Sequence, residues 1–303
     1  MLFRQIGPAL VVDAPAKVNL FLEILAKRND GFHELETLMV SVDLYDTLVF
    51  MEGPSERVTL RCVDAGSTEG TDFAGETSFP GGRDNLVVQA ARLLREYTGV
   101  KNGVRIDLLK RIPVAAGLAG GSSDAAATLM ALSRFWNLRL SVVELERLAL
   151  QLGSDVGFFL SSSVAAICRG RGERIEPLCL SDRLHFVIAR PPTGLSTAVV
   201  FRNCSVPHTP RRVRPLAVAL RQGDLGRAVQ YLHNGLQSPA EKLNPDVQRI
   251  RSIFSQQPVL GHLMSGSGTS YFGLCANRRQ AIQVAARLRL QHVGRVFVAQ
   301  SRS

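Results

Sequence analysis

Residues 113–124 decide the fold of this chain, and they read Pro113-Val114-Ala115-Ala116-Gly117-Leu118-Ala119-Gly120-Gly121-Ser122-Ser123-Asp124. A strand-like segment at residues 104–109 precedes them, and an Ala-rich helical run from residue 125 to about residue 135 follows. Glycine lets a backbone approach phosphate oxygens closely, and a helix N-terminus offers free N–H groups and a positive dipole end. A strand, a Gly/Ser loop and a helix start therefore predict an anion-binding loop. The alternative is a flexible linker, which the immediate helix disfavours.

The loop differs from the two common nucleotide-binding patterns. The chain contains no Gly-Lys-Ser/Thr tripeptide, and the loop lacks the Gly-x-Gly-x-x-Gly spacing of dinucleotide sites. A Gly-rich loop alone is weak evidence for a nucleotide, so the rest of the chain has to supply the specificity.

Strand and helix patterns follow one another in an uneven order. We expect strands at residues 10–13, 18–24, 58–63, 104–109, 164–169, 173–178, 184–189, 259–264, 270–275 and 295–299. We expect helices at residues 85–97, 125–135, 141–152, 195–202, 214–232, 245–256 and 278–290. This order predicts the α+β class and not a regular βαβ array. The length of 303 residues predicts two domains, which we place at residues 1–178 and 179–303.

Local signals fix some of the element ends. Asp84 is the expected N-cap of the helix at residues 85–97, and Gly99 is expected to end it. Ser141 and Glu144 have the spacing of a capping box at the start of the helix at residues 141–152. The Gly, Ser, Thr and acidic residues at 64–83 predict a surface loop.

The formal net charge of +10 is distributed unevenly. Residues 181–303 contain 17 Lys and Arg and only four Asp and Glu, whereas residues 1–180 contain 19 and 22. A basic half suggests an anionic partner, such as nucleic acid, an acidic membrane surface or a phosphorylated small molecule. A solvated Arg-rich surface explains the charge equally well.

Cysteine and histidine usage excludes two classes of protein. The five cysteines and six histidines are scattered, without the spacing of a zinc site or a disulfide framework. The first eight residues lack the apolar region of a signal peptide, and no apolar stretch reaches the roughly 18 residues of a membrane span. We therefore expect a soluble, cytoplasmic protein without a membrane partner.

Three motifs in order resemble those of the GHMP kinases, the family of galactose, homoserine, mevalonate and phosphomevalonate kinases. The central loop resembles the second motif in Pro113-x-x-x-Gly117-Leu118-x-x-x-Ser122-Ser123. The segment at residues 15–20, Pro15-Ala16-Lys17-Val18-Asn19-Leu20, resembles the first motif of the family. The segment at residues 264–270, Met264-Ser265-Gly266-Ser267-Gly268-Thr269-Ser270, resembles the third. Three ordered motifs over most of the chain are far more specific than any one. The resemblance implies a first domain like ribosomal protein S5 domain 2 and a ferredoxin-like second domain.

The resemblance also implies the cofactors and the catalytic residues. ATP would bind residues 113–123, and Mg²⁺ would accompany its phosphates with Ser123 as a candidate ligand. Asp155 is the candidate catalytic base, because a kinase needs a carboxylate within reach of the attacking hydroxyl. From the residues alone Asp155 is a simple helix cap, and the resemblance reverses that preference. Lys17 matches a family lysine that lies beside the catalytic aspartate; without the motif it would be a snorkelling strand-end lysine.

Further segments resemble one branch of the family, namely Asp30-Gly31-Phe32-His33-Glu34-Leu35, Asp43-Leu44-Tyr45-Asp46 and Gly153-Ser154-Asp155-Val156. That branch phosphorylates the 2-hydroxyl of the methylerythritol unit in a cytidine diphosphate ester, in non-mevalonate isoprenoid biosynthesis. Phe32 would stack on the cytosine and His33 would hydrogen-bond its edge, although a core Phe and an exposed His are the ordinary alternative. The remaining candidate substrate residues are Asn19, Gly266, Ser267, Gly268 and Thr269.

Four positions depart from the family pattern. Phe32 stands where Tyr is usual, and Ala119 stands where Gly is usual. Ser154 and Gly157 replace a usual Ala and Pro around Asp155. These changes keep the assignment but leave kinetic effects open.

Two rival functions remain. The first is another GHMP kinase, of the homoserine or mevalonate type. The second is a basic RNA-binding protein, suggested by the charge of residues 181–303 but without the aromatic residues or motifs of such proteins. We expect a small-molecule substrate, no nucleic-acid partner, and a monomer or weak homodimer.

Overall fold

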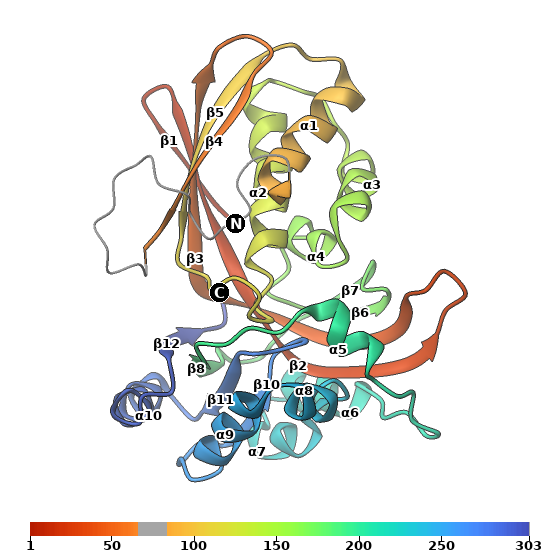
Figure 1. Cartoon of the computed structure of the whole chain (residues 1–303), viewed down its shortest axis with the longest axis vertical. Coiled ribbons are helices and arrows are strands. Elements are labelled where there is room, and N and C mark those ends of the chain that lie inside the picture. The colour runs from red at the N-terminus through yellow and green to blue at the C-terminus, as the bar shows by residue number, and fades with distance from the viewer. Residues whose placement is uncertain (66–83, 303) are drawn as a thin grey trace. The chain divides into compact units, whose positions relative to one another are not determined.

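The computed structural model describes residues 1–65 and 84–302 (Figure 1). The loop predicted at residues 64–83 lies outside the described residues apart from its first two positions. Contacts divide the chain into two compact units. The first unit comprises Met1–Ala16, Leu44–Val114 and Ala119–Ser162, and the second comprises Lys17–Asp43, Ala115–Leu118 and Ser163–Ser303. The single domain boundary at residues 178 and 179 stays a prediction.

In its described residues, the first unit combines a sheet with four α-helices (Figure 1). Its strands are β1 (Leu2–Ile6), the start of β2 (Ala9–Lys27), the end of β3 (His33–Gly53), β4 (Val58–Asp64) and β5 (Gly103–Lys110). The sheet order is β1-β2-β3-β5-β4, in which β4 and β5 run parallel and β3 and β5 antiparallel. The helices are α1 (Leu86–Thr98), α2 (Gly120–Phe135), α3 (Val142–Leu152) and α4 (Val156–Leu160).

Helix ends in this unit follow local capping chemistry. The side chain of Asn85 accepts a hydrogen bond from the backbone N–H of Val87 at 2.9 Å, so Asn85 and not Asp84 caps α1. Gly99 ends α1 with a φ of 72°, as predicted. The predicted capping box of Ser141 and Glu144 is confirmed at the start of α3. Helix α2 begins at Gly120, five residues earlier than predicted, so the Gly-Gly-Ser-Ser segment forms its first turn.

The second unit contains an antiparallel sheet of four strands in the order β10-β11-β8-β12. These strands are β8 (His185–Arg190), β10 (Gly261–Met264), β11 (Tyr271–Cys275) and β12 (Arg295–Gln300). In the same unit β6 (Ala165–Gly170) pairs with β3 and with β7 (Arg174–Leu178), and β9 (His233–Asn234) pairs with β2. The helices are α5 (Thr197–Arg202), α6 (Arg214–Arg221), α7 (Leu225–Ala228), α8 (Gln237–Leu243), α9 (Pro245–Phe254) and α10 (Arg278–Leu290).

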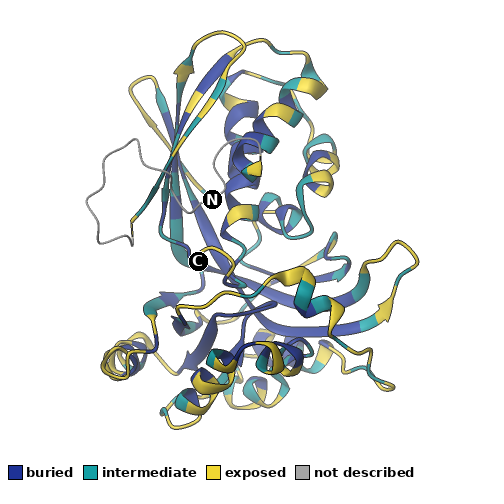
Figure 2. Cartoon of the chain, viewed as in Figure 1, coloured by how far each residue is buried: buried dark blue, intermediate teal, exposed yellow. Residues whose placement is uncertain are grey.

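The core of the second unit is built from one face of α10 and α9 against the four-stranded sheet. Ala281, Val284 and Leu288 of α10 are buried with Phe254 of α9 and Tyr271 of β11. Figure 2 shows the opposite side of α10 as exposed, which is the pattern of an amphipathic helix on a sheet.

Several parts of the structure differ from the predictions, which also lacked β1 and β9. Residues 10–13 and 18–24 belong to one strand, β2, that continues through Pro15, and β3 and α8 were not predicted. The helix predicted at residues 214–232 ends at Arg221, because Gly223 has a φ of 73° and Asp224 caps the next helix by accepting from Arg227 N–H at 2.9 Å. The mixture of helices with mainly antiparallel strands is α+β, as predicted.

Candidate active site

The three sequence motifs meet at one backbone carbonyl in the second unit. Nζ of Lys17 donates to the carbonyl oxygen of Gly117 at 3.1 Å, and the Ser265 hydroxyl donates to the same oxygen at 2.9 Å. The Ser265 hydroxyl also accepts from the backbone N–H of Asn19 at 3.2 Å. One carbonyl of the Gly-rich segment thus joins the first motif to the third.

Lys17 lies among buried polar groups. Only 3% of its surface is exposed, and Nζ donates to Oδ1 of Asn19 at 2.5 Å. The Asn19 amide donates to the hydroxyl of Thr37 at 2.8 Å, which itself donates to the carbonyl of Phe21 at 2.6 Å. The side chain therefore does not end in water, as a snorkelling lysine would. A buried cation with fixed oxygen partners is suited to stabilising negative charge.

Glycine is required on both sides of this contact. Gly117 has a φ of 73°, and a Cβ there would lie 2.0 Å from the carbonyl oxygen of Ser265. Gly266 has a φ of 57°, and a Cβ there would lie 3.2 Å from Nζ of Lys17. The left-handed backbone and the close approach both exclude a larger residue at Gly117.

The Gly/Ser turn at residues 265–269 is buried and anchored by its neighbours. The side-chain amide of Asn234 donates to the carbonyls of Met264 and Gly266, each at 2.8 Å. Both bonds hold the backbone of the turn in place.

Two hydroxyl contacts fix the far end of the same turn. The Thr269 hydroxyl donates to the carbonyl of Thr193 at 2.9 Å, and the hydroxyls of Ser267 and Thr197 lie 2.8 Å apart in a hydrogen bond. The predicted residues Gly266, Ser267, Gly268 and Thr269 thus form a fixed turn in the unit that contains Lys17.

Phe32 and His33 lie at the turn between β2 and β3, also in the second unit. Phe32 is 48% exposed, so it is not the core residue of the ordinary alternative. The His33 ring lies 5.5 Å from the ring of Phe201, and its Nε2 lies 3.7 Å from Sγ of Cys204. Burial, and then the charge of Lys27, lowers the pKa of His33, so its imidazole is neutral near pH 7. A neutral imidazole offers one donor and one acceptor to the edge of a ligand.

The first turn of α2 lies in the first unit. Ala119 precedes it with a left-handed backbone, φ 56° and ψ 31°, where glycine is the usual residue because it has no Cβ. A Cβ on Gly120 would lie 2.9 Å from Cγ2 of Ile112 and 3.1 Å from Nζ of Lys110. The start of the helix is therefore pressed against β5 and the residues that follow it.

Ser123 is the strongest candidate ligand of this turn. Its residue is fully buried, and its hydroxyl has no hydrogen-bond partner within residues 1–65 and 84–302. A buried hydroxyl without a partner is costly unless a ligand or ion supplies one.

Three buried charges brace the same turn. Nζ of Lys110 donates to carboxylates of Asp46 and Asp124, the latter at 2.7 Å. Oδ1 of Asp46 also accepts from the backbone N–H groups of Arg111 at 2.6 Å and Ile112 at 2.9 Å. Burial opposes the charge on Lys110, but the two carboxylates outweigh it and raise its pKa. Burial raises the pKa of Asp124 to about 7, although Lys110 opposes this.

Asp155 lies in the first unit, at the N-terminus of α4. Its side chain makes no capping hydrogen bond to that helix, so the simple cap is not formed. Helix α4 packs against α2, and a Cβ on Gly153 would lie 4.0 Å from Oγ of Ser122. The loop that carries Asp155 is therefore beside the first turn of α2.

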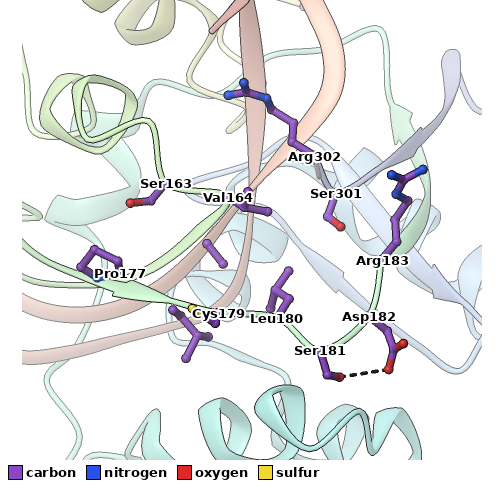
Figure 3. Close-up of a pocket in the computed structure, with 12 residues that line it drawn as sticks. Ser163, Val164, Pro177, Cys179, Leu180, Ser181, Asp182, Arg183, Ser301 and Arg302 are labelled. Atoms are coloured by element: carbon purple, nitrogen blue, oxygen red, sulfur yellow. Dashed lines mark hydrogen bonds between the residues drawn. The ribbon is translucent and has the colours of Figure 1, made fainter.

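A separate pocket of about 480 Å³ lies in the second unit, between the β6–β7 hairpin and the end of the chain (Figure 3). Cys179, Arg183 and Arg302 are among its lining residues, which include none of the predicted site residues. Among residues 1–65 and 84–302, no three His, Cys, Asp or Glu side chains lie together in a way that could hold a metal ion. No helix in these residues is long and apolar enough to cross a membrane.

Sequence reasoning missed the residues that hold the site together. Thr37, Thr193, Thr197, Phe201 and Asn234 all contact predicted residues. Most of these contacts go to backbone carbonyls or single hydroxyls, which leave no pattern in the sequence.

Comparisons with known proteins agree with these motifs. The family model "GHMP kinases N terminal domain" matches residues 85–170, and "GHMP kinases C terminal" matches residues 216–293. A 4-diphosphocytidyl-2-C-methyl-D-erythritol kinase of Pelotomaculum thermopropionicum is 43% identical over 278 residues, which cover 91% of this chain and 92% of the relative.

Solved structures give the same picture. A crystal structure of a 4-(cytidine 5'-diphospho)-2C-methyl-D-erythritol kinase has a TM-score of 0.79 and 35% identity, covering 97% of this chain and all of the other. A homoserine kinase of Cytophaga hutchinsonii has a TM-score of 0.71 at 18% identity, covering 100% and 97%, and shares the fold. The chain therefore belongs to the GHMP kinases and, within them, to the family of 4-diphosphocytidyl-2-C-methyl-D-erythritol kinases.

Proposed function

We propose that this chain transfers a phosphoryl group from ATP to the 2-hydroxyl of 4-diphosphocytidyl-2-C-methyl-D-erythritol, in non-mevalonate isoprenoid biosynthesis. One observation carries the proposal: the side chains of Lys17 and Ser265 both donate to the carbonyl oxygen of Gly117, which brings the three family motifs together. Lys17 lies 100 positions before Gly117, and Ser265 lies 148 positions after it. The membership of the chain in this kinase family supports the choice of substrate.

ATP is the proposed phosphoryl donor, and its phosphates would bind the segment Pro113, Val114, Ala115, Ala116, Gly117, Leu118, Ala119, Gly120, Gly121, Ser122 and Ser123. The first turn of α2 offers N–H groups and a positive dipole end to an anion. Mg²⁺ fits the same place, because the buried Ser123 hydroxyl is an unused oxygen donor of the kind that Mg²⁺ accepts. When bound, the ion would neutralise charge on the phosphates, and Ser123 would hold it.

Asp155 is the proposed catalytic base. It would orient the 2-hydroxyl and accept its proton while the oxygen bonds to the terminal phosphorus and ADP leaves. Lys17 would stabilise the negative charge of the reacting groups, which its burial strengthens. Asn19 and the turn Gly266, Ser267, Gly268 and Thr269 would hold the substrate beside it.

The cytidine end of the substrate would bind at Phe32 and His33. Phe32 presents an exposed ring, and the neutral His33 presents a donor and an acceptor. Phe201 joins this proposal because its ring faces His33.

The finer assignments of fold and setting are also proposals. The order β10-β11-β8-β12, with α10 between β11 and β12, supports a ferredoxin-like second domain. The first domain would be like ribosomal protein S5 domain 2, and the domains would divide at residues 178 and 179. We place the enzyme in the cytoplasm, which its five free cysteines support. We propose that it is a monomer or weak homodimer and binds no nucleic acid.

A substrate panel tests the function. ADP formation would be measured with the cytidine diphosphate substrate, homoserine and mevalonate under identical conditions. We expect turnover of the first alone. Turnover of homoserine or mevalonate without the cytidine compound would replace this proposal with another GHMP kinase activity.

A further inference from the structure

The exposed ring of Phe32 has a partner that no family motif includes. The guanidinium carbon of Arg171 lies 3.7 Å from the centroid of the Phe32 ring. That distance is a close cation–π contact over a ring face. With the guanidinium in place, 48% of the Phe32 residue is still exposed, which leaves surface for a ligand to contact.

Arg171 is presented by a fixed turn between β6 and β7. Its backbone N–H donates to the carboxylate of Glu173 at 2.5 Å, and the flanking Gly170 and Gly172 have φ values of 78° and 120°. The left-handed backbone at Gly170 favours glycine, and a Cβ there would displace the Glu173 carboxylate that holds the turn. The backbone thus fixes the position from which Arg171 reaches Phe32.

The backbone of Phe32 is held by two hydrogen bonds within its own turn. Its backbone N–H donates to Oδ1 of Asp30 at 3.1 Å, and its carbonyl accepts from the N–H of Arg28 at 2.8 Å. The hydrogen bond from Phe32, and then the charges of Arg28 and Arg171, lower the pKa of Asp30, so this carboxylate is ionised at neutral pH. The backbone of Phe32 is therefore fixed, and the rotation of its ring is the freedom that remains.

We propose that Arg171 is a positioning residue that braces one face of the Phe32 ring so that the other face is ready to stack on the cytosine of the substrate. This proposal rests on the proposed function, because it needs a pyrimidine at Phe32. An exposed phenylalanine without a neighbour samples several rotamers, and ordering it on binding lowers affinity. A guanidinium on one face orders the ring before the substrate binds, so the loss of rotamer entropy on binding is smaller and the other face stays in position.

Kinetics of Arg171→Ala test the brace. A cation–π contact at an exposed site is worth about 0.5–1 kcal/mol, so KM for the cytidine substrate should rise about two- to fivefold. The kcat and the KM for ATP should stay unchanged, since Arg171 acts through Phe32 alone. Arg171→Lys keeps a cation and should recover most of the affinity. A lower KM would mean that Arg171 competes with the base for the ring, and that result or an unchanged KM overturns the proposal.

Two controls separate the brace from a general effect of charge. Arg174→Ala removes an exposed cation from the same hairpin, one that pairs with Glu34 and not with the ring, and should leave KM unchanged. In a Phe32→Ala background, Arg171→Ala should have no further effect on KM. Additive losses in the double variant would contradict the brace.

A spectroscopic readout separates failure of the brace from failure of the proposed function. If the wild-type chain does not turn over the cytidine substrate, the proposed function fails. The brace is then judged from NMR of ring-labelled phenylalanine, with the Phe32 signal assigned by Phe32→Leu. Arg171→Ala should shift and narrow that signal as the ring becomes mobile, and an unchanged signal overturns the brace.

Discussion

Asp155 occupies the position before a short helix, yet its carboxylate makes no hydrogen bond that would cap it. We propose, from the match of the Gly153-Ser154-Asp155-Val156 segment to the kinase family, that this carboxylate accepts the proton of the attacking hydroxyl. Asp155→Asn should lower kcat by about 10²- to 10⁴-fold, since an amide cannot take the proton. Binding of ATP, measured by calorimetry, and the thermal unfolding temperature should stay close to wild type.

The neighbouring Ser154→Ala is the matched control for this variant. It alters the same loop without touching the proposed base, so kcat should change little. Near-normal turnover by Asp155→Asn would remove Asp155 from the mechanism, whatever the control shows.

Asp124 makes stability depend on pH in an identifiable way. Burial raises its pKa to about 7 from the ordinary value of 3.8, so between these values the folded chain holds a proton that the unfolded chain has lost. This contribution to the free energy of unfolding is therefore present at low pH and lost as pH rises toward 7. Compared with Asp124→Asn, the wild type should lose stability from about pH 4 to about pH 7, measured by urea unfolding.

Comparison with the variant is necessary because other groups titrate in the same window. Burial lowers the pKa of His185, His233 and His262, which makes stability rise with pH and opposes the effect of Asp124. These histidines are common to both proteins, so they cancel in the difference. A difference that stays constant from about pH 4 to about pH 7 would show that Asp124 does not hold the proton.

At the scale of elements, the contribution to stability of the contact between the Gly-rich segment and the Gly/Ser turn can be measured apart from the cost of backbone strain. Gly117 and Gly99 have nearly equal φ values, 73° and 72°, but only Gly117 has a close neighbour. Gly99→Ala should cost about 1–2 kcal/mol from its conformation alone. Gly117→Ala should cost clearly more and should weaken ATP binding, because the loop must move away from Ser265. Equal losses of unfolding free energy in the two variants would contradict this.

Element boundaries were predictable where local chemistry sets them. Helix α10 runs from Arg278 to Leu290 as predicted, and Asn277 caps it. Strand β2 was predicted as two pieces because Pro15 stands between two segments that alternate only in part. The structure explains the weak alternation, since nearly all of Leu10 to Ile24 is buried on both faces. Pro15 lies within that strand, where sequence rules place a break.

The candidate site was predictable to the level of its motifs and no further. Lys17, Gly117 and Ser265 belong to recognisable patterns, and these residues do meet. Thr37 holds Asn19 and Asn234 holds the carbonyl of Gly266. Both were missed because a hydroxyl or an amide that bonds a backbone carbonyl needs no particular neighbours in sequence. Arg171 was missed for the same reason, since its ring contact arises from the pairing of β6 with β3.

For the whole molecule, the excess of basic residues at positions 181–303 is the feature that suggested RNA binding. The dependence of binding on salt concentration distinguishes that function from the kinase. An RNA-binding protein that neutralises many phosphates would lose about 10³- to 10⁵-fold in affinity between about 50 and 200 mM salt. We expect no such binding to single-stranded RNA, measured by fluorescence anisotropy. The KM for ATP should change by less than about tenfold over the same range, since backbone N–H groups of one helix turn would hold its phosphates. Tight, salt-sensitive RNA binding would restore the alternative.

The burial of Lys17 and Lys110 also has a consequence for protein chemistry. The chain has five lysines, all in its described part, and these two are buried while Lys27, Lys101 and Lys242 are exposed. An amine-reactive dye or resin therefore meets only three accessible side-chain amines on the folded chain. Labelling or immobilisation through them leaves Lys17 unmodified, and acylation of Lys17 becomes a chemical marker that this part of the molecule has opened.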